Sequence, residues 1–120
     1  MDYEKLCKDA MDIDPDIRFA IILSRYGERI AGGYRENTSS LLSTAEINMS
    51  LFYASQRWDT RIKFSHRIGD PEFSFTQYKK VKQITMPVNE QNLMLVSTET
   101  SADHVKIIDK LLNFLKNNST

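Results

Sequence analysis

The sequence predicts an α+β fold: a five-stranded antiparallel sheet with helices on its faces, in the order α-β-β-α-β-β-β-α. Two observations lead to this prediction. Segments with the length and apolar pattern of strands occur at residues 17–24, 29–35, 72–78, 81–88 and 93–97. Segments in which apolar residues recur every three or four positions occur at 3–13, from 43 onward and at 102–116. The chain of 120 residues has the length of one domain, so we expect a single α+β domain over 1–120, with a tail at 117–120 that frays.

The first helix and strand have clear boundaries. Asp2 is placed to cap a helix over 3–13, and Pro15 removes Asp14 from helical conformation and ends it. The segment 17–24 is apolar on both of its faces, which is typical of a strand in the middle of a sheet.

The next segment, 29–35, returns as the second strand of a hairpin. Gly27 in the connecting turn supplies the conformational freedom that such a turn needs. Gly32 and Gly33 interrupt the strand, which indicates a bulge or a close approach of another part of the chain.

A long helix follows a polar loop. Ser43 and Glu46 have the spacing of a capping box, and Leu42 and Ile47 occupy the positions of a hydrophobic staple. The helix reaches at least Arg61, and at most Arg67, because Gly69 and Pro71 stop it.

The C-terminal half predicts three strands joined as a meander and a last helix over 102–116, capped by Ser101 or Thr100. The first and last strands are the most apolar, so we expect them to lie side by side in the middle. The second and third strands then form the two edges of the sheet.

Composition and charge exclude several classes of protein. Basic and acidic residues number 16 each, and the single cysteine excludes an internal disulfide. The chain contains no pair of metal-ligand residues at a recognised spacing, no nucleophile motif and no phosphate loop. We therefore expect no enzyme activity, no catalytic residues, no cofactor and no metal. The absence of a signal peptide or membrane-spanning segment predicts a cytoplasmic location.

The predicted third strand carries Phe73 and Phe75 on one face, with Tyr78 beyond. Edge strands with such faces invite pairing, and two-fold dimers are the commonest oligomers. We expect a homodimer whose interface uses Leu51, Tyr53, Trp58, Phe73 and Phe75. The alternative, in which Phe73 and Phe75 face the core beneath the long helix, fits the sequence equally well, and both can hold.

The segment 57–82 is basic, with seven basic and three acidic residues, whereas 1–17 has two basic and six acidic ones. This asymmetry predicts a basic patch that meets an acidic protein partner, formed by Arg57, Arg61, Lys63, Arg67, Lys79, Lys80 and Lys82. The simpler alternative is that the two segments neutralise each other on one folded surface. A weaker alternative is nucleic-acid binding through the same segment.

A further alternative is a small-molecule sensor. An antiparallel sheet covered by a helix can hold a ligand in a cleft, and such a cleft would be lined by Tyr26, Tyr34, Met49 and Met86.

The order of elements over residues 3–116 resembles that of the roadblock/LC7 modules, within the wider profilin-like group. This resemblance implies a module that dimerises through its long second helix and its third strand. It also implies a regulatory platform, often for small GTPases, without enzyme chemistry of its own. Four segments, DIRFA (16–20), IAGG (30–33), RWDTR (57–61) and YKKVKQITMP (78–87), are in addition similar to a set of small proteins of ammonia-oxidising archaea. That set has no assigned activity and supplies no catalytic residues.

Overall fold

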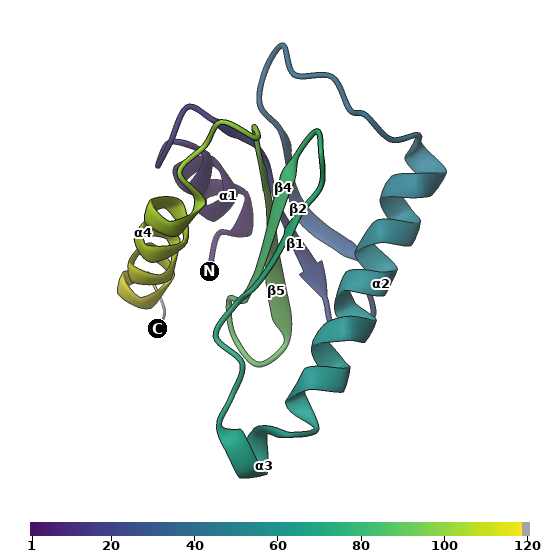
Figure 1. The fold of residues 1–120 in the computed structure, drawn as a ribbon, viewed down its shortest axis with the longest axis vertical. Helices are drawn as coiled ribbons and strands as arrows, with labels where there is room; N and C mark the ends of the chain where they lie inside the picture. Colours follow the sequence, from purple (N-terminus) through teal and green to yellow (C-terminus); the bar gives the residue numbers. More distant parts are fainter. Residues whose placement is uncertain (119–120) are drawn as a thin grey trace.

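The computed structural model describes residues 1–118, which form one five-stranded sheet flanked by helices (Figure 1). The elements are α1 (Tyr3–Met11), β1 (Ile17–Ser24), β2 (Arg29–Tyr34), α2 (Thr44–Ile62), α3 (Ser65–Ile68), β3 (Ser74–Gln77), β4 (Lys82–Pro87), β5 (Asn92–Thr98) and α4 (His104–Asn117). The predicted fold class is confirmed.

The strands lie in the order β2-β1-β5-β4-β3, and every neighbouring pair is antiparallel. The two most apolar strands, β1 and β5, are adjacent, and β2 and β3 are the edges, as the sequence predicts. Every residue of β5 is buried, because this strand has a neighbour on each side and a helix layer on each face.

The helices form two layers. Helices α1 and α4 cover one face of the sheet, and α2 covers part of the other (Figure 1). One core cluster lies under α1 and α4 and includes Ile17, Ile22 and Ile107. The other lies under α2 and includes Phe19, Leu95 and other residues of β1 and β5. The N-terminus and the last residue of α4 lie on the same side of the sheet, in the α1 and α4 layer (Figure 1).

The start of α2 agrees with its prediction. The Ser43 hydroxyl accepts a hydrogen bond from the Glu46 amide at 3.2 Å, and the Ser43 amide donates to the Glu46 carboxylate at 3.0 Å. These bonds hold the pKa of the Glu46 carboxyl below its usual value. This reciprocal capping box fixes where the helix begins.

The long helix ends at Ile62, within the predicted range, and a separate short helix, α3, follows it. Two other predicted boundaries need correction. Helix α1 ends at Met11, earlier than predicted. The cap of α4 is Asp103, whose side chain accepts from the Lys106 amide, because a carboxylate at this position satisfies a first-turn N–H. Neither Ser101 nor Thr100 is the cap.

The predicted tail is only partly described. Asn117 is the last residue of α4 and Asn118 is its C-cap, so the tail predicted at 117–120 begins at the end of the helix. Residues 119–120 lie outside the described part of the chain.

The close approach predicted at the two glycines occurs at Gly32. Its φ is +91°, and a Cβ there would lie 2.1 Å from the Ala20 carbonyl oxygen and 2.8 Å from the Cys7 sulfur. The β1–β2 register also shifts between Ile22 and Leu23. Glycine is required at position 32 both by the backbone angle and by the neighbouring strand and helix.

Candidate functional site

Two of the predicted interface residues belong to the core. Leu51 and Trp58 are each only 2% exposed and pack against the sheet from α2. They lie seven residues apart, which is two helical turns, so both point in the same direction as the buried Ala54. Neither is available to a second chain, and their assignment to an interface is wrong.

The opposite side of α2 presents apolar side chains to solvent. Met49 is 58% exposed and Tyr53 52% exposed, and they lie one helical turn apart. Phe52, also exposed, contacts Tyr53 edge to face, with ring centroids 5.5 Å apart. Of the predicted helix residues, Tyr53 is therefore the one that a partner can reach.

The two predicted phenylalanines near β3 differ in environment. Phe73 precedes the strand and is 43% exposed. Phe75 is half-buried against the core under α1 and α4, and its ring stacks on His104 with centroids 4.3 Å apart. Phe75 thus packs in the layer opposite the long helix, and the alternative that placed it beneath that helix is wrong.

The predicted basic patch does not form one surface. Lys82 is buried, and its ammonium donates to the Ala102 carbonyl at 2.7 Å and contacts His104 Nδ1 at 3.0 Å. The other six residues form two groups. Lys79, Lys80 and Arg57 surround a cleft beside α2, whereas Arg61, Lys63 and Arg67 lie at the end of α2 and in α3.

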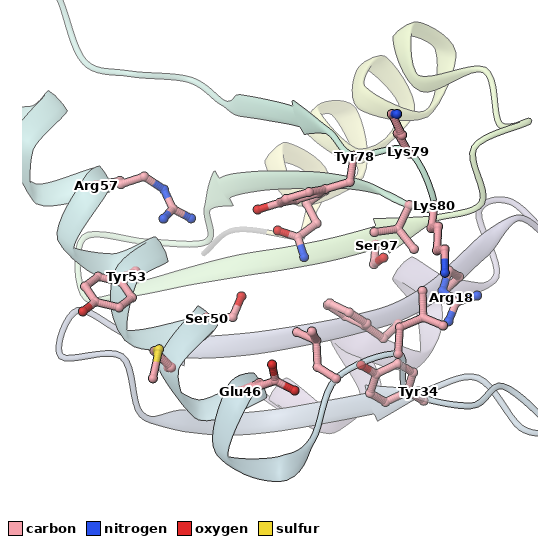
Figure 2. Close-up of a pocket in the computed structure, with 16 residues that line it drawn as sticks. Arg18, Tyr34, Glu46, Ser50, Tyr53, Arg57, Tyr78, Lys79, Lys80 and Ser97 are labelled. Atoms are coloured by element: carbon pink, nitrogen blue, oxygen red, sulfur yellow. The ribbon is translucent and has the colours of Figure 1, made fainter.

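The cleft has a volume of 620 Å³ and lies between α2 and the turn that joins β3 to β4 (Figure 2). Its floor is a row of paired residues that crosses the sheet, since Gln83 pairs with Ser97, Ser97 with Phe19, and Phe19 with Tyr34. Its volume falls within the range of small-molecule sites, roughly 300–1,000 Å³.

The walls of the cleft come from three parts of the chain. Helix α2 supplies Glu46, Met49, Ser50, Tyr53 and Arg57, and the β3–β4 turn supplies Tyr78, Lys79 and Lys80. Leu41 and Leu42, in the loop before α2, close one end. The cleft exists because the core under α2 takes its residues from β1, β5 and β2, so the helix leaves the β4 side of the sheet uncovered.

Under the small-molecule sensor alternative, four residues were expected to line the cleft. Two of them do and two do not. Tyr34 and Met49 line the cleft. Tyr26 is in the β1–β2 turn and 82% exposed, and Met86 is fully buried in the core under α1 and α4. The assignment of these two to the cleft is wrong.

The cleft carries an excess of uncommitted positive charge. Arg18 donates to Glu99 at 3.1 Å and to the Ser39 carbonyl at 2.8 Å, so its charge is already neutralised. Glu46 is committed to the capping box. Within residues 1–118, no acidic group lies within ion-pair distance of Arg57, Lys79 or Lys80.

Sequence reasoning missed Gln83 and Ser97 on the cleft floor. A signal for Ser97 was present, because it continues the alternation of Leu93 and Leu95, which face α2, with a hydroxyl in place of a third apolar side chain.

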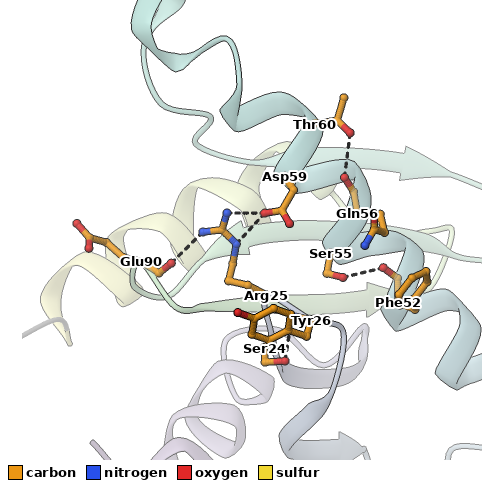
Figure 3. Close-up of polar contacts among 9 residues, drawn as sticks. All are labelled: Ser24, Arg25, Tyr26, Phe52, Ser55, Gln56, Asp59, Thr60 and Glu90. Carbon is orange, nitrogen blue, oxygen red and sulfur yellow. Dashed lines mark hydrogen bonds and ion pairs between the residues drawn. The ribbon is translucent and has the colours of Figure 1, made fainter.

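Polar contacts hold the C-terminal half of α2 against the rest of the fold (Figure 3). Arg25 donates to the Asp59 carboxylate from Nε at 3.0 Å and also from Nη2, and to the Glu90 carbonyl at 2.9 Å. A Cβ on Gly27 would lie 2.6 Å from the Phe52 Cα, so the β1–β2 turn packs closely against α2. These contacts hold the helix over β1 and so keep the cleft open on its other flank.

Among the described residues, no group of three or more His, Cys, Asp or Glu side chains is arranged to hold a metal ion. Within the same residues, no helix is both long and apolar enough to cross a membrane.

This layered arrangement is the fold of the roadblock/LC7 modules, within the profilin-like group. A roadblock/LC7 domain from Streptomyces avermitilis has a TM-score of 0.75 and 14% identity, over 98% of this chain and 94% of that one. An MglB structure described as having a tetrameric arrangement has a TM-score of 0.69 and 9% identity, over 94% and 87%. Schizosaccharomyces pombe profilin has a TM-score of 0.62 and 13% identity, over 96% and 97%. At these identities the likeness establishes the fold alone.

Residues 1–117 match the family described as a family of unknown function (DUF6659), and the chain belongs to that family. No curated protein matches the chain.

Proposed function

We propose that the protein is a homodimeric, non-enzymatic interaction module of roadblock type. The observation that carries this proposal is the free edge of β3, which has no strand beside it among residues 1–118. The exposed apolar side chains Tyr53 and Phe73 lie on α2 and directly before β3.

The free edge is suited to pairing. Strand β3 hydrogen-bonds only to β4, so the N–H and C=O groups on its outer side are open to another strand. A second copy related by a two-fold axis would pair β3 with β3 and extend the sheet across both chains. The short length of β3, four residues, limits this contact, so the dimer also needs apolar surface from elsewhere.

Helix α2 offers that apolar surface. Met49 and Tyr53 are large and more than half exposed. Tyrosine, phenylalanine and methionine are enriched in protein interfaces because they bury much apolar area, and tyrosine in addition keeps a polar tip. The tetrameric arrangement of MglB, which has the same fold, supports self-association as a property available to this fold.

The experiment measures mass in solution. Sedimentation equilibrium or light scattering over a range of concentrations is expected to give a dimer for the natural chain. Replacing Tyr53 or Phe73 with Glu places a charge in the interface and is expected to weaken the dimer at least tenfold. The control for Phe73→Glu is Tyr26→Glu, because Tyr26 is an exposed tyrosine in the turn between β1 and β2, at the other side of the strand order from β3.

A strict monomer at high concentration would contradict the proposal. Equal weakening by the Tyr26 and Phe73 variants would also count against it, because it would indicate a general effect of the added charge.

The partner of such a dimer is proposed to be a protein with an acidic surface, a small GTPase being the class that the roadblock resemblance implies. The exposed cations Arg61, Lys63 and Arg67 supply the complementary charge. An affinity pull-down from the native host tests this, and recovery of no acidic partner would argue against it.

A further inference from the structure

We propose that the cleft beside α2 binds a small organic anion with a flat apolar body, whose carboxylate or phosphate group pairs with the cation at one end of the cleft, Lys80 or Arg57. This proposal goes beyond the interaction module. All the lining residues come from one chain, but Met49 and Tyr53 also belong to the proposed dimer surface, so a ligand and a second copy would compete for this part of α2.

The floor of the cleft contains polar groups that no other residue satisfies. Ser97 is only 2% exposed, yet its hydroxyl has no hydrogen-bond partner among residues 1–118 and faces the cleft. The same holds for the half-buried amide of Gln83, which lies directly opposite Ser97 on β4. Among residues 1–118, the buried side-chain polar atom that lacks a partner is Ser65 Oγ, so the polar atoms of Ser97 and Gln83 are reached by solvent from the cleft. Both groups are therefore free to bond to a molecule in the cleft.

The aromatic residues determine the shape of the molecule that fits. Phe19 and Tyr34 form an edge-to-face pair on the floor, with ring centroids 5.0 Å apart. Tyr78 lies above the floor from the β3–β4 turn, and Tyr53 lies along α2 (Figure 2). Aromatic side chains on two sides of a narrow space favour a flat apolar body over a flexible polar one.

The charges determine the sign of the ligand. Arg57 extends from α2 toward Tyr78, and Lys80 lies near Arg18 at the other end of the cleft (Figure 2). Since Arg18 is neutralised by Glu99, the uncommitted charges are those of Arg57, Lys79 and Lys80, against the single carboxylate of Glu46. A cation or a neutral molecule would leave these charges unpaired, whereas an anion gains charge-assisted hydrogen bonds.

The test uses small probes and NMR of the uniformly ¹⁵N-labelled chain. Phenyl phosphate and benzoate are titrated, with benzyl alcohol and benzamide as neutral probes of the same size. The anionic probes are expected to shift the amide signals of Phe19, Gln83 and Ser97, and the neutral probes to bind more weakly. The stronger of the two anions identifies whether phosphate or carboxylate is the group that the cleft recognises.

Variants locate the binding. Of Arg57→Gln and Lys80→Gln, the variant that removes the paired cation is expected to weaken the anionic probes about tenfold, and it identifies the end of the cleft that holds the anionic group. The matched controls are Arg61→Gln and Lys63→Gln, which remove exposed cations outside the cleft and should leave binding unchanged. All four residues are exposed, so the variants should fold.

Three results would overturn the proposal: no shifts in the cleft, shifts scattered over the surface, or neutral probes that bind as tightly as anions. Equal weakening by the cleft variants and their controls would do the same, because it would mean non-specific charge attraction.

Discussion

Replacing a glycine with alanine can destabilise the fold in two ways, through an unfavourable backbone angle and through a clash of the added Cβ. Substitutions at Gly32, Gly33 and Gly69 distinguish the two effects. Gly69 has a φ of +88° and a ψ of 168°, with nothing within 4 Å of the added Cβ, so Gly69→Ala has only the backbone cost, about 1–3 kcal/mol. Gly33 has an ordinary φ, and its Cβ would meet only the flexible end of Arg29 at 3.0 Å. Gly33→Ala should therefore change stability by less than about 0.5 kcal/mol.

Gly32→Ala has both costs. Its φ is as unfavourable as that of Gly69, and its Cβ would lie 2.1 Å from the Ala20 carbonyl oxygen, where ordinary contact is 3.4–4 Å. The nearest atoms include the β1 backbone, so β1 and β2 must separate locally by more than an ångström. We expect a loss of at least about 3 kcal/mol, a large part of the 5–15 kcal/mol typical of a domain.

Urea unfolding followed by the fluorescence of Trp58, the single tryptophan, measures these differences. The midpoint for Gly32→Ala should fall by about 1–3 M, for a slope of 1–3 kcal/mol per molar urea. The reasoning is refuted if Gly32→Ala is no less stable than Gly69→Ala, because the close approach would then cost nothing.

Three further predictions follow from buried or capping groups. Burial, reinforced by the nearby Glu4 carboxylate, raises the pKa of the Cys7 thiol from 9.0 to about 11. The Cys7 thiol therefore ionises more readily in the unfolded chain than in the folded one. The fold keeps its full stability below pH 9 and loses part of it as the pH rises toward 11, so the urea midpoint should fall over that range. Iodoacetamide should also label Cys7 slowly unless urea is added. Lys82→Met leaves the Ala102 carbonyl without its donor and should cost about 1–3 kcal/mol by urea unfolding, whereas Lys80→Met at an exposed site should cost less than about 0.5 kcal/mol. Ser43→Ala removes the capping hydroxyl of α2 and should cost about 1 kcal/mol in the same assay, with a loss of helical circular dichroism.

The elements predicted best from sequence are those in which local and global signals agree. The capping box at Ser43 predicts the start of a helix, and the apolar residues on both faces of 17–24 predict a central strand. Both predictions are confirmed. The capping of α4 was misplaced because Thr100, Ser101 and Asp103 are all acceptable caps, and only the conformation of the chain distinguishes them.

The site was harder to predict, because the burial of a side chain on a helix depends on whether its side of the helix packs against the sheet. Trp58 and Tyr53 are both large and aromatic on one helix, yet their difference of five residues places them on opposite sides of it. Lys82 was grouped with the surface lysines, since nothing local indicates that its chain runs under α4 to Ala102. The cleft itself arises from how far α2 extends across the sheet, a property of packing that no single segment encodes.

The N-terminal residue and the end of α4 at Asn117 lie in the α1 and α4 layer, on the side of the sheet away from α2 (Figure 1). Affinity tags, fluorophores or surface-immobilisation handles fused at either end will therefore project away from the cleft. Either fusion can accordingly be used for solution measurements without the label itself obstructing what is being measured.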